Sequence, residues 1–122
     1  MDEHPYHKLI VWKEAYRFVK DVYAVTRTFP SEEKFGVTSQ LRRAATSIIL
    51  NIAEGQGKRS PKDFQRFCDI ANGSVRECAV LLELSRDLGY LNGVQYDQFD
   101  KQLRQTGSLL SRLMAYIETI AR

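Results

Sequence analysis

Apolar residues recur at intervals of three and four along most of the chain, which is the spacing of one face of an α-helix. The alternation of apolar and polar residues that marks a half-exposed strand is absent from the sequence. The pattern predicts four helices, over residues 7–29, 38–55, 61–88 and 93–121. Because the connections are short, we expect an all-α fold: an antiparallel up-down-up-down four-helix bundle that forms a single domain over residues 1–122.

Each predicted helix carries one apolar stripe that we expect to face the core. In the first helix the stripe consists of Leu9, Trp12, Tyr16, Val19, Tyr23 and Thr26. In the second it consists of Leu41, Ala45, Ile48 and Ile52. The third helix has Phe64, Phe67, Ala71, Ser74, Cys78, Leu81, Ser85 and Leu88, and the fourth has Tyr96, Phe99, Leu103, Thr106, Leu110, Leu113, Ile117 and Ile120. The aromatic residues are therefore expected to pack in the core rather than to stack on nucleic-acid bases.

Local signals mark the ends of the helices. Ser60 and Asn92 are expected N-caps, and Gly89 suits a C-terminal stop. Gly55 and Gly57 are expected to end the second helix in the left-handed backbone conformation that glycine adopts without strain.

The run from Gly55 to Lys58 shares glycines and a lysine with phosphate-binding loops. Such a loop needs a further glycine where Ile52 stands and a serine or threonine where Arg59 stands. It also follows a strand, whereas a predicted helix precedes this run. The run is therefore expected to be a joint between helices.

The second helix reads AATSIILNIA over residues 44–53 and is nonpolar on nearly every side. A helix of this kind is buried on more than one face. In a domain of this size the second face is expected to meet another subunit, so the sequence predicts a homo-oligomer.

Positive charge is concentrated in one segment. Residues 34–66 hold seven Lys or Arg against two Asp or Glu, a net of +5, whereas the whole chain carries +3. A basic patch of this kind favours RNA, DNA or another acidic partner, although a solvated surface is the alternative. The candidate nucleic-acid-binding residues are Arg42, Arg43, Lys58, Arg59, Lys62 and Arg66, with a second basic line of Lys13, Arg17 and Lys20 on the first helix.

Five polar residues lie in an apolar setting on two helices expected to be neighbours. They are Ser47, Asn51, Glu54, Ser74 and Glu77. Because burying such groups is costly unless they find partners, we expect a structural polar network that ties helices or subunits together.

The alternative is that Glu54 and Glu77 act as an acid/base or metal-binding pair. The only histidines, His4 and His7, precede the first helix, whereas di-metal bundles carry histidine on the helices themselves. We therefore expect no enzymatic activity, no cofactor and no metal.

The cysteines and the apolar runs bear on the cellular compartment. Cys68 and Cys78 are ten residues apart in one predicted helix, about 15 Å along its axis, so a disulfide between them is excluded. No apolar run reaches the roughly 20 residues of a membrane span, and the acidic, polar N-terminus is no secretory signal. The expected location is the cytoplasm.

A family resemblance is carried by Gln40–Ala44, Ser47, Asn51–Gly55, and Gly73–Ser74 with Glu77, together with LIVWKEAY in the first helix. These segments resemble the four-helix bundle proteins encoded in intervening sequences of 23S ribosomal RNA genes. The resemblance implies a small bacterial protein that assembles as a homopentamer. The chain is also distantly similar to the accessory protein of diversity-generating retroelements, which binds nucleic acid and assists a reverse transcriptase.

The expected function is therefore that of a non-enzymatic homo-oligomeric bundle that binds structured RNA or another nucleic acid through basic surfaces. The alternative is a scaffold or accessory subunit that binds a protein partner and does not contact nucleic acid directly.

Overall fold

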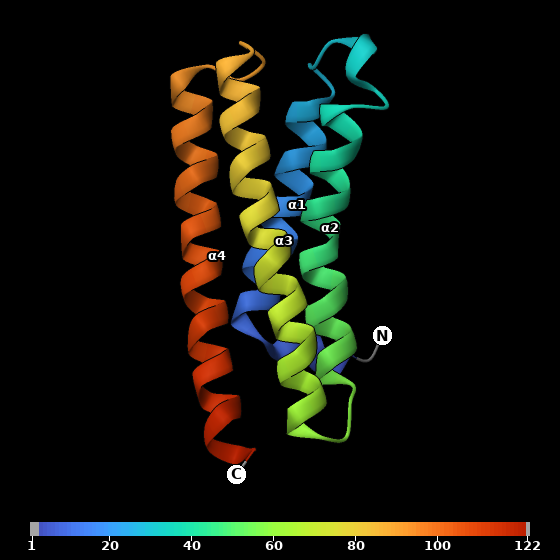
Figure 1. Ribbon diagram of the computed structural model, residues 1–122, viewed down its shortest axis with the longest axis vertical. Helices are drawn as coiled ribbons and strands as arrows, with labels where there is room; N and C mark the ends of the chain where they lie inside the picture. Colours follow the sequence, from blue (N-terminus) through green and yellow to red (C-terminus); the bar gives the residue numbers. More distant parts are fainter. Residues whose placement is uncertain (1–2, 122) are drawn as a thin grey trace.

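The computed structural model describes residues 3–121 and shows four long helices packed side by side (Figure 1). The helices are α1 (Ile10–Thr26), α2 (Val37–Gln56), α3 (Pro61–Asp87) and α4 (Gly93–Ile120), with short 3-10 helices η1 (Pro5–Lys8) and η2 (Ser31–Glu33) on either side of α1. Consecutive helices run in opposite directions, and the start of α1 and the end of α4 lie toward the same end of the bundle. The prediction of an antiparallel four-helix bundle is confirmed.

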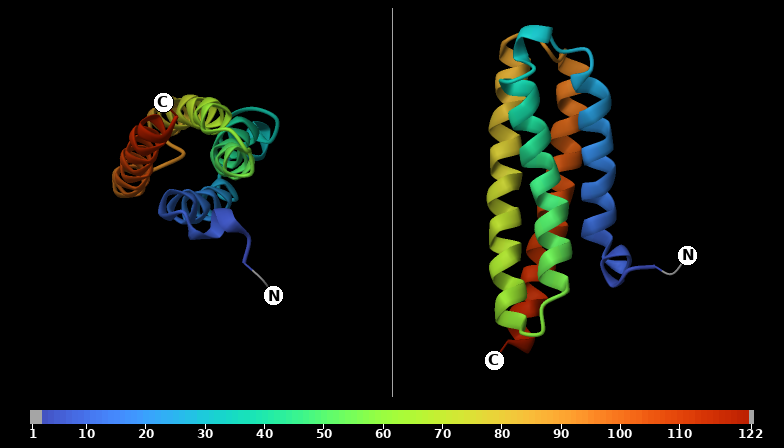
Figure 2. Two further views of the ribbon diagram at one scale, coloured as in Figure 1. Left: turned by 90° about the horizontal axis from the view of Figure 1, so that it is seen from below. Right: turned by 90° about the vertical axis from the view of Figure 1, so that its right-hand side faces the viewer.

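Each helix packs against the next one in the sequence, and α4 closes the bundle against α1 (Figure 2). α2 therefore lies between α1 and α3 and has two seams, one with each neighbour. The joint between α2 and α3 lies at the same end of the bundle as η1 and the start of α1.

The core is formed by one face of every helix. The predicted stripe of α2 is fully buried, and the α4 stripe is buried at Phe99, Leu103, Thr106, Leu110 and Ile117, while Leu113 between them is partly buried. Each fully buried large apolar side chain contributes roughly 1.5–3 kcal/mol to the free energy of folding. Among the residues described no helix combines the length and apolar character needed to cross a bilayer.

The predicted core stripe of α1 is wrong for two of its residues. Tyr16 and Tyr23 are 42% and 39% exposed, whereas the buried residues of α1 include Ala15, Phe18 and Val22. The helix carries two adjoining apolar stripes about a quarter of a turn apart, and spacing by three and four fits both. The core takes the aliphatic stripe with Phe18, and the tyrosines keep their hydroxyl-bearing rings at the surface.

α1 is also shorter than residues 7–29. Leu9 has an extended backbone (φ −77°, ψ 122°), which separates η1 from α1. At the other end the helix stops at Thr26, and Phe29 folds back into the core in the following turn, where it is 7% exposed.

The predicted caps of α3 and α4 are present. The Ser60 hydroxyl accepts a hydrogen bond of 3.3 Å from the Asp63 amide. Asn92 and Gln95 form a reciprocal capping box with bonds of 2.8 and 2.9 Å. Gly89 has φ +81°, the left-handed conformation expected after α3.

The expected role of Gly55 and Gly57 is corrected by the structure. Gly55 lies inside α2, and Gly57, which ends the helix, has φ −78°, so neither needs left-handed backbone. A Cβ atom on Gly55 would lie 2.8 Å from the Phe67 Cβ and 2.9 Å from the Phe64 Cδ1. Gly55 is therefore required because it lets α2 and α3 approach closely at the joint.

Candidate nucleic-acid interface

The joint between α2 and α3 holds two cations against one aromatic ring. The Lys58 ammonium lies 5.3 Å from the centre of the Phe67 ring, and the Arg66 guanidinium lies 4.9 Å from it. Lys58 also pairs with Glu54 at 3.2 Å, and Arg66 pairs with Asp63 at 3.8 Å. Exposed pairs of this kind contribute only ~0–1 kcal/mol, so an arriving phosphate can displace them.

Arg59 and Lys62 complete this basic cluster. Both are exposed, and neither forms an ion pair within residues 3–121. Arg59 belongs to the connection that follows α2, and Lys62 lies in the first turn of α3, where the backbone amides point outward. We call Lys58, Arg59, Lys62 and Arg66 the joint cluster.

The second basic line follows the outer face of α1. Lys13, Arg17 and Lys20 are all exposed. Arg17 forms an exposed ion pair of 3.4 Å with Glu14, and the Lys20 ammonium lies 5.1 Å from the centre of the Tyr16 ring. α1 begins at the end of the bundle that holds the joint cluster, and the basic line runs from there along the helix toward the other end.

The neighbouring arginines of α2 have different surroundings. Arg42 donates from Nε to the Thr26 hydroxyl at 2.8 Å and from Nη2 to the Tyr23 carbonyl at 3.4 Å. Its guanidinium also lies 4.7 Å from the centre of the Tyr23 ring. Arg42 thus clamps α2 to α1, and a phosphate would have to compete with these bonds. Arg43 is exposed and lies apart from the joint cluster, on the face shared by α2 and α3.

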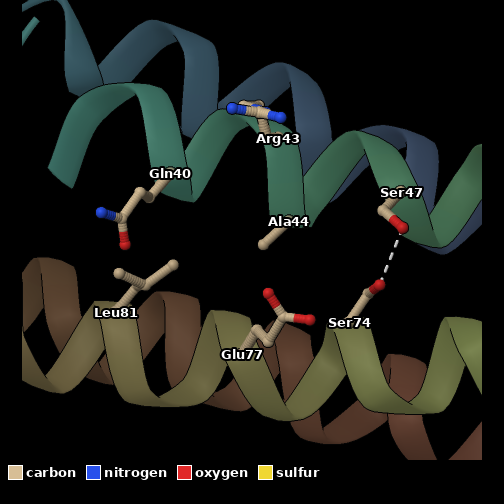
Figure 3. A pocket seen from close by; sticks show the side chains of 7 residues that line it. All are labelled: Gln40, Arg43, Ala44, Ser47, Ser74, Glu77 and Leu81. Carbon is tan, nitrogen blue, oxygen red and sulfur yellow. Dashed lines mark hydrogen bonds between the residues drawn. The ribbon is translucent and has the colours of Figure 1, made fainter. Parts of the chain in front are cut away.

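Three of the five expected network residues are joined by hydrogen bonds. The Ser74 hydroxyl donates to the Ser47 hydroxyl oxygen at 2.8 Å, which links α3 to α2 (Figure 3). The Asn51 amide donates to the Ser47 carbonyl at 2.8 Å and to its hydroxyl oxygen at 3.0 Å. Glu54 lies outside this network because it is exposed beside Lys58, and the exposed Glu77 faces a groove.

Glu54 and Glu77 are also too far apart to act together. Gly55 contacts the turn of α3 that holds Phe64 and Phe67, whereas Glu77 lies ten residues beyond Phe67, about 15 Å along the axis. Residues 3–121 contain no group of three or more histidine, cysteine, aspartate or glutamate side chains placed to hold a metal. The geometry gives the alternative of a shared metal or acid/base pair no support.

A shallow groove of about 380 Å³ runs between α2 and α3. It is lined by Gln40, Arg43, Ala44, Ser47, Ser74, Glu77 and Leu81. The Glu77 carboxylate points into the groove, while the Arg43 guanidinium points away from it (Figure 3). Large apolar side chains flank the groove on the same two helices: Leu50, Ile70, Val80 and Leu84 are 65%, 45%, 64% and 41% exposed. We call this surface the α2–α3 face.

The two cysteines are buried and free. Burial raises the pKa of the Cys68 and Cys78 thiols to about 12, with a smaller contribution from Asp69 and Glu77 respectively. Both remain protonated at neutral pH, and a protonated buried thiol is a poor nucleophile and a poor metal ligand. The expectation that no disulfide joins them is confirmed.

A family model described as "23S rRNA-intervening sequence protein" matches residues 7–112. The chain belongs to this family. A crystal structure of a protein of unknown function from the S23 ribosomal protein family of Bacteroides thetaiotaomicron superposes with a TM-score of 0.80. It is 24% identical in sequence, and the match covers 86% of this chain and 98% of that one. No curated protein matches the chain. The predicted family is thereby confirmed, and the similar structure supports the same helical fold.

Proposed function

We propose that this chain is a non-enzymatic bundle that assembles with copies of itself and binds nucleic acid through the joint cluster and the basic line of α1. The observation that carries the proposal is the joint cluster. Four cations gather where α3 begins, and two of them, Arg59 and Lys62, have no acidic partner within the described chain. Phosphate groups supply the negative charge that this surface lacks.

The distant similarity to the accessory protein of diversity-generating retroelements, which binds nucleic acid, agrees with the same function. Contacts to phosphates position a nucleic acid without reading its sequence, so we expect affinity for structured RNA that depends on salt more than on sequence. The connection at Arg59 and the helical turn at Lys62 hold the cations at one end of the bundle, where a ring of subunits would repeat them.

Binding to labelled fragments of ribosomal RNA across a salt series tests this function. Replacing Lys58, Arg59, Lys62 and Arg66 together by glutamine should weaken binding and flatten the plot of log affinity against log salt concentration. The slope should fall by ~0.7–0.9 for each phosphate that the variant no longer neutralises. The matched control replaces Lys34, Lys101, Arg104 and Arg112, which are also exposed, and so removes the same charge.

The proposal fails under any of three results. These are no binding at low salt, affinity that does not change with salt, or an equal loss of affinity in the control variant. The first two would remove the electrostatic mechanism, and the third would reduce it to a general effect of net charge.

Self-assembly is proposed to use the α2–α3 face. Four large apolar side chains are exposed on these two helices, and exposed apolar surface is typical of protein contacts. Arg43 and Glu77, of opposite charge, are both exposed there and make no ion pair in the part of the chain that the structure describes. They are therefore available to pair across a subunit contact. A pentamer is the state that the family resemblance implies.

Light scattering on two matched variants tests the assembly. Val80→Glu places a charge on the α2–α3 face at a side chain that is 64% exposed, and it should shift the mass to that of a monomer. Val94→Glu makes the same change at a side chain that is 69% exposed in the first turn of α4, and it should keep the assembly intact. A monomeric wild-type chain would overturn self-assembly. It would favour the alternative, in which the exposed α2–α3 face binds a different protein.

A further inference from the structure

The aromatic residues of η1 and α1 form a continuous stack. The rings of His4 and Tyr6 are parallel to within 6°, with centres 5.3 Å apart. Tyr6 and His7 both contact Trp12, with ring centres 4.9 and 5.1 Å away. Trp12 then stacks on Tyr16, with centres 4.8 Å apart and planes inclined by 15°. Because Trp12 and Tyr16 are one turn apart, the stack runs along α1.

The stack is held in place and ends at an accessible ring. The Trp12 indole N–H donates to the Ile49 carbonyl of α2 at 3.2 Å, which fixes the orientation of the ring. One face of Tyr16 meets Trp12, so the Lys20 ammonium at 5.1 Å covers the other. Tyr16 is 42% exposed, and its cover on this face is a flexible, exposed lysine.

A second aromatic platform follows at Tyr23. It lies two turns beyond Tyr16, about 10 Å along the helix, and Arg42 packs on its ring. The distance from Tyr16 to Tyr23 is close to the length of three stacked nucleotides, at ~3.4 Å each. Lys13, Arg17 and Lys20 run beside the rings over a similar length. Aromatic faces and cations thus alternate along one edge of α1.

We propose that this edge of α1 binds a single-stranded nucleic acid, whose bases stack on Tyr16 and beside Tyr23 while Lys13, Arg17 and Lys20 contact its phosphates. The inference rests on the proposed nucleic-acid binding and names the part of the ligand that this surface takes. Lys20 leaves the ring of Tyr16 when a base arrives and meets the phosphate of the same nucleotide. A duplex is disfavoured because its base faces are already stacked on one another, whereas single strands offer them.

Because the aromatic stack is already formed, a base that binds to Tyr16 should lose little affinity to the conformational entropy of ordering the ring. Tyr16 is held by Trp12, and Trp12 is held by both Ile49 and the rings of η1, so the platform needs no ordering when a base arrives. Charge complementarity favours a polyanion over a second copy of this basic chain. The exposed aliphatic side chains that suit self-assembly lie on the α2–α3 face instead.

The experiment compares a labelled oligouridylate strand with an RNA duplex of matched length, each titrated with the 122-residue protein. Tyr16→Leu should weaken binding of the single strand about tenfold, because each base stacked on an aromatic ring contributes ~1–3 kcal/mol, and it should leave duplex binding unchanged. Tyr16→Trp should restore single-strand binding. Tyr116→Leu on α4, at a side chain that is 62% exposed, is the matched control and should have no effect.

Fluorescence of the single tryptophan gives a local readout. Trp12 stacks on Tyr16, so binding of the single strand should change the emission of Trp12 in the wild type and not in Tyr16→Leu. The inference is overturned if Tyr16→Leu leaves single-strand affinity intact, if it weakens duplex binding equally, or if it lowers the mass of the assembly, which would assign the ring to a subunit contact. If only the joint-cluster variant loses affinity, base stacking on Tyr16 is rejected and the proposed nucleic-acid binding stands. If neither RNA binds at low salt, base stacking and nucleic-acid binding are both rejected.

Discussion

The two seams of α2 are built in opposite ways. Toward α3, the contact is made by small residues: Gly55 lies against Phe64 and Phe67, and the Ser47 and Ser74 hydroxyls meet at 2.8 Å. Toward α1, long side chains bridge the seam. Trp12 of α1 reaches the Ile49 carbonyl, and Arg42 of α2 reaches Thr26 and Tyr23.

This difference decides what each seam can do. Backbones that approach closely leave no room for extra atoms, so the α2–α3 seam should be sensitive to added volume. Side chains that bridge the α1–α2 seam leave ring faces and cations at the surface, so the binding that we propose there requires no repacking of the core. The close seam fixes the geometry of the bundle, and the bridged seam provides the surface on which we place the bases.

The largest effect is expected at the close seam. Gly55→Ala would place a methyl group 2.8 Å from the Phe67 Cβ, which costs about 1–3 kcal/mol of overpacking, offset by about 1 kcal/mol of improved helix propensity. The two contributions leave a net loss of up to about 2 kcal/mol in the free energy of unfolding. Urea denaturation at one fixed protein concentration measures it.

The matched control for this prediction is Gly107→Ala in α4. A Cβ there would meet Val75 at 3.7 Å, an ordinary contact, so alanine should stabilise the helix by up to about 1 kcal/mol. Equal stability of the two variants would contradict this prediction. It would show that α2 and α3 can move apart at Gly55 to accommodate a methyl group.

A smaller effect is expected at the bridged seam, from the pair of neighbouring arginines. Arg42→Lys removes the Nε bond to Thr26 and the planar contact with Tyr23, and should cost about 1 kcal/mol. Arg43→Lys should leave the free energy of unfolding unchanged, because Arg43 is exposed and makes no such bond. Thermal melts at matched concentration distinguish them. A similar cost at both positions would contradict the clamp.

The smallest effect is expected outside both seams, where η2 and the connection before α4 meet. The Tyr90 hydroxyl donates to Glu33 at 2.6 Å, and the other Glu33 oxygen accepts the Val37 amide at 3.2 Å at the start of α2. This Tyr90–Glu33 hydrogen bond is the main cause of two pKa shifts. It lowers the pKa of Glu33 from 4.5, and it raises the pKa of Tyr90 from 10.0 to about 12.

These pKa shifts predict how the loss of stability in Tyr90→Phe depends on pH. The raised tyrosine pKa stabilises the fold fully below pH 10.0, and this stability is lost as the pH rises toward about 12. The lowered Glu33 pKa stabilises the fold above pH 4.5, and this stability is lost as the pH falls through the lowered value. The difference in melting temperature between wild type and variant should therefore be greatest between these limits and shrink outside them. A difference that is constant from pH 7 to 11 would exclude the bond.

Sequence spacing predicted the bundle, the caps at Ser60 and Asn92 and the core stripe of α2 because these depend on local periodicity and on short-range hydrogen bonds. Sequence spacing failed where two apolar stripes on one helix fitted the helical period equally well. On α1, the stripe with Tyr16 and the stripe with Phe18 have the same spacing, and only packing against α2 and α4 selects one. It failed also at Gly55, whose need for glycine arises from Phe64 and Phe67 rather than from its own backbone.

The candidate site divides in the same way. The sequence located the cations of the joint cluster because charge is visible residue by residue. It grouped Arg42 with them because nothing local shows that Thr26, sixteen residues away, takes up its guanidinium. It likewise grouped Glu54 and Glu77 with Ser47, although helix packing carries both carboxylates to the surface.

By itself the sequence determined the fold class and where positive charge gathers, since periodicity, capping and charge are properties of neighbouring residues. The family followed from a resemblance in short motifs. Only the tertiary structure decided which side of α1 faces the core and that Trp12 and Tyr16 form a surface stack. It also decided that Arg42, and not Arg43, is hydrogen-bonded to α1. Those outcomes depend on contacts between helices that are distant in the chain, and their energies are set by the distances at which the helices pack.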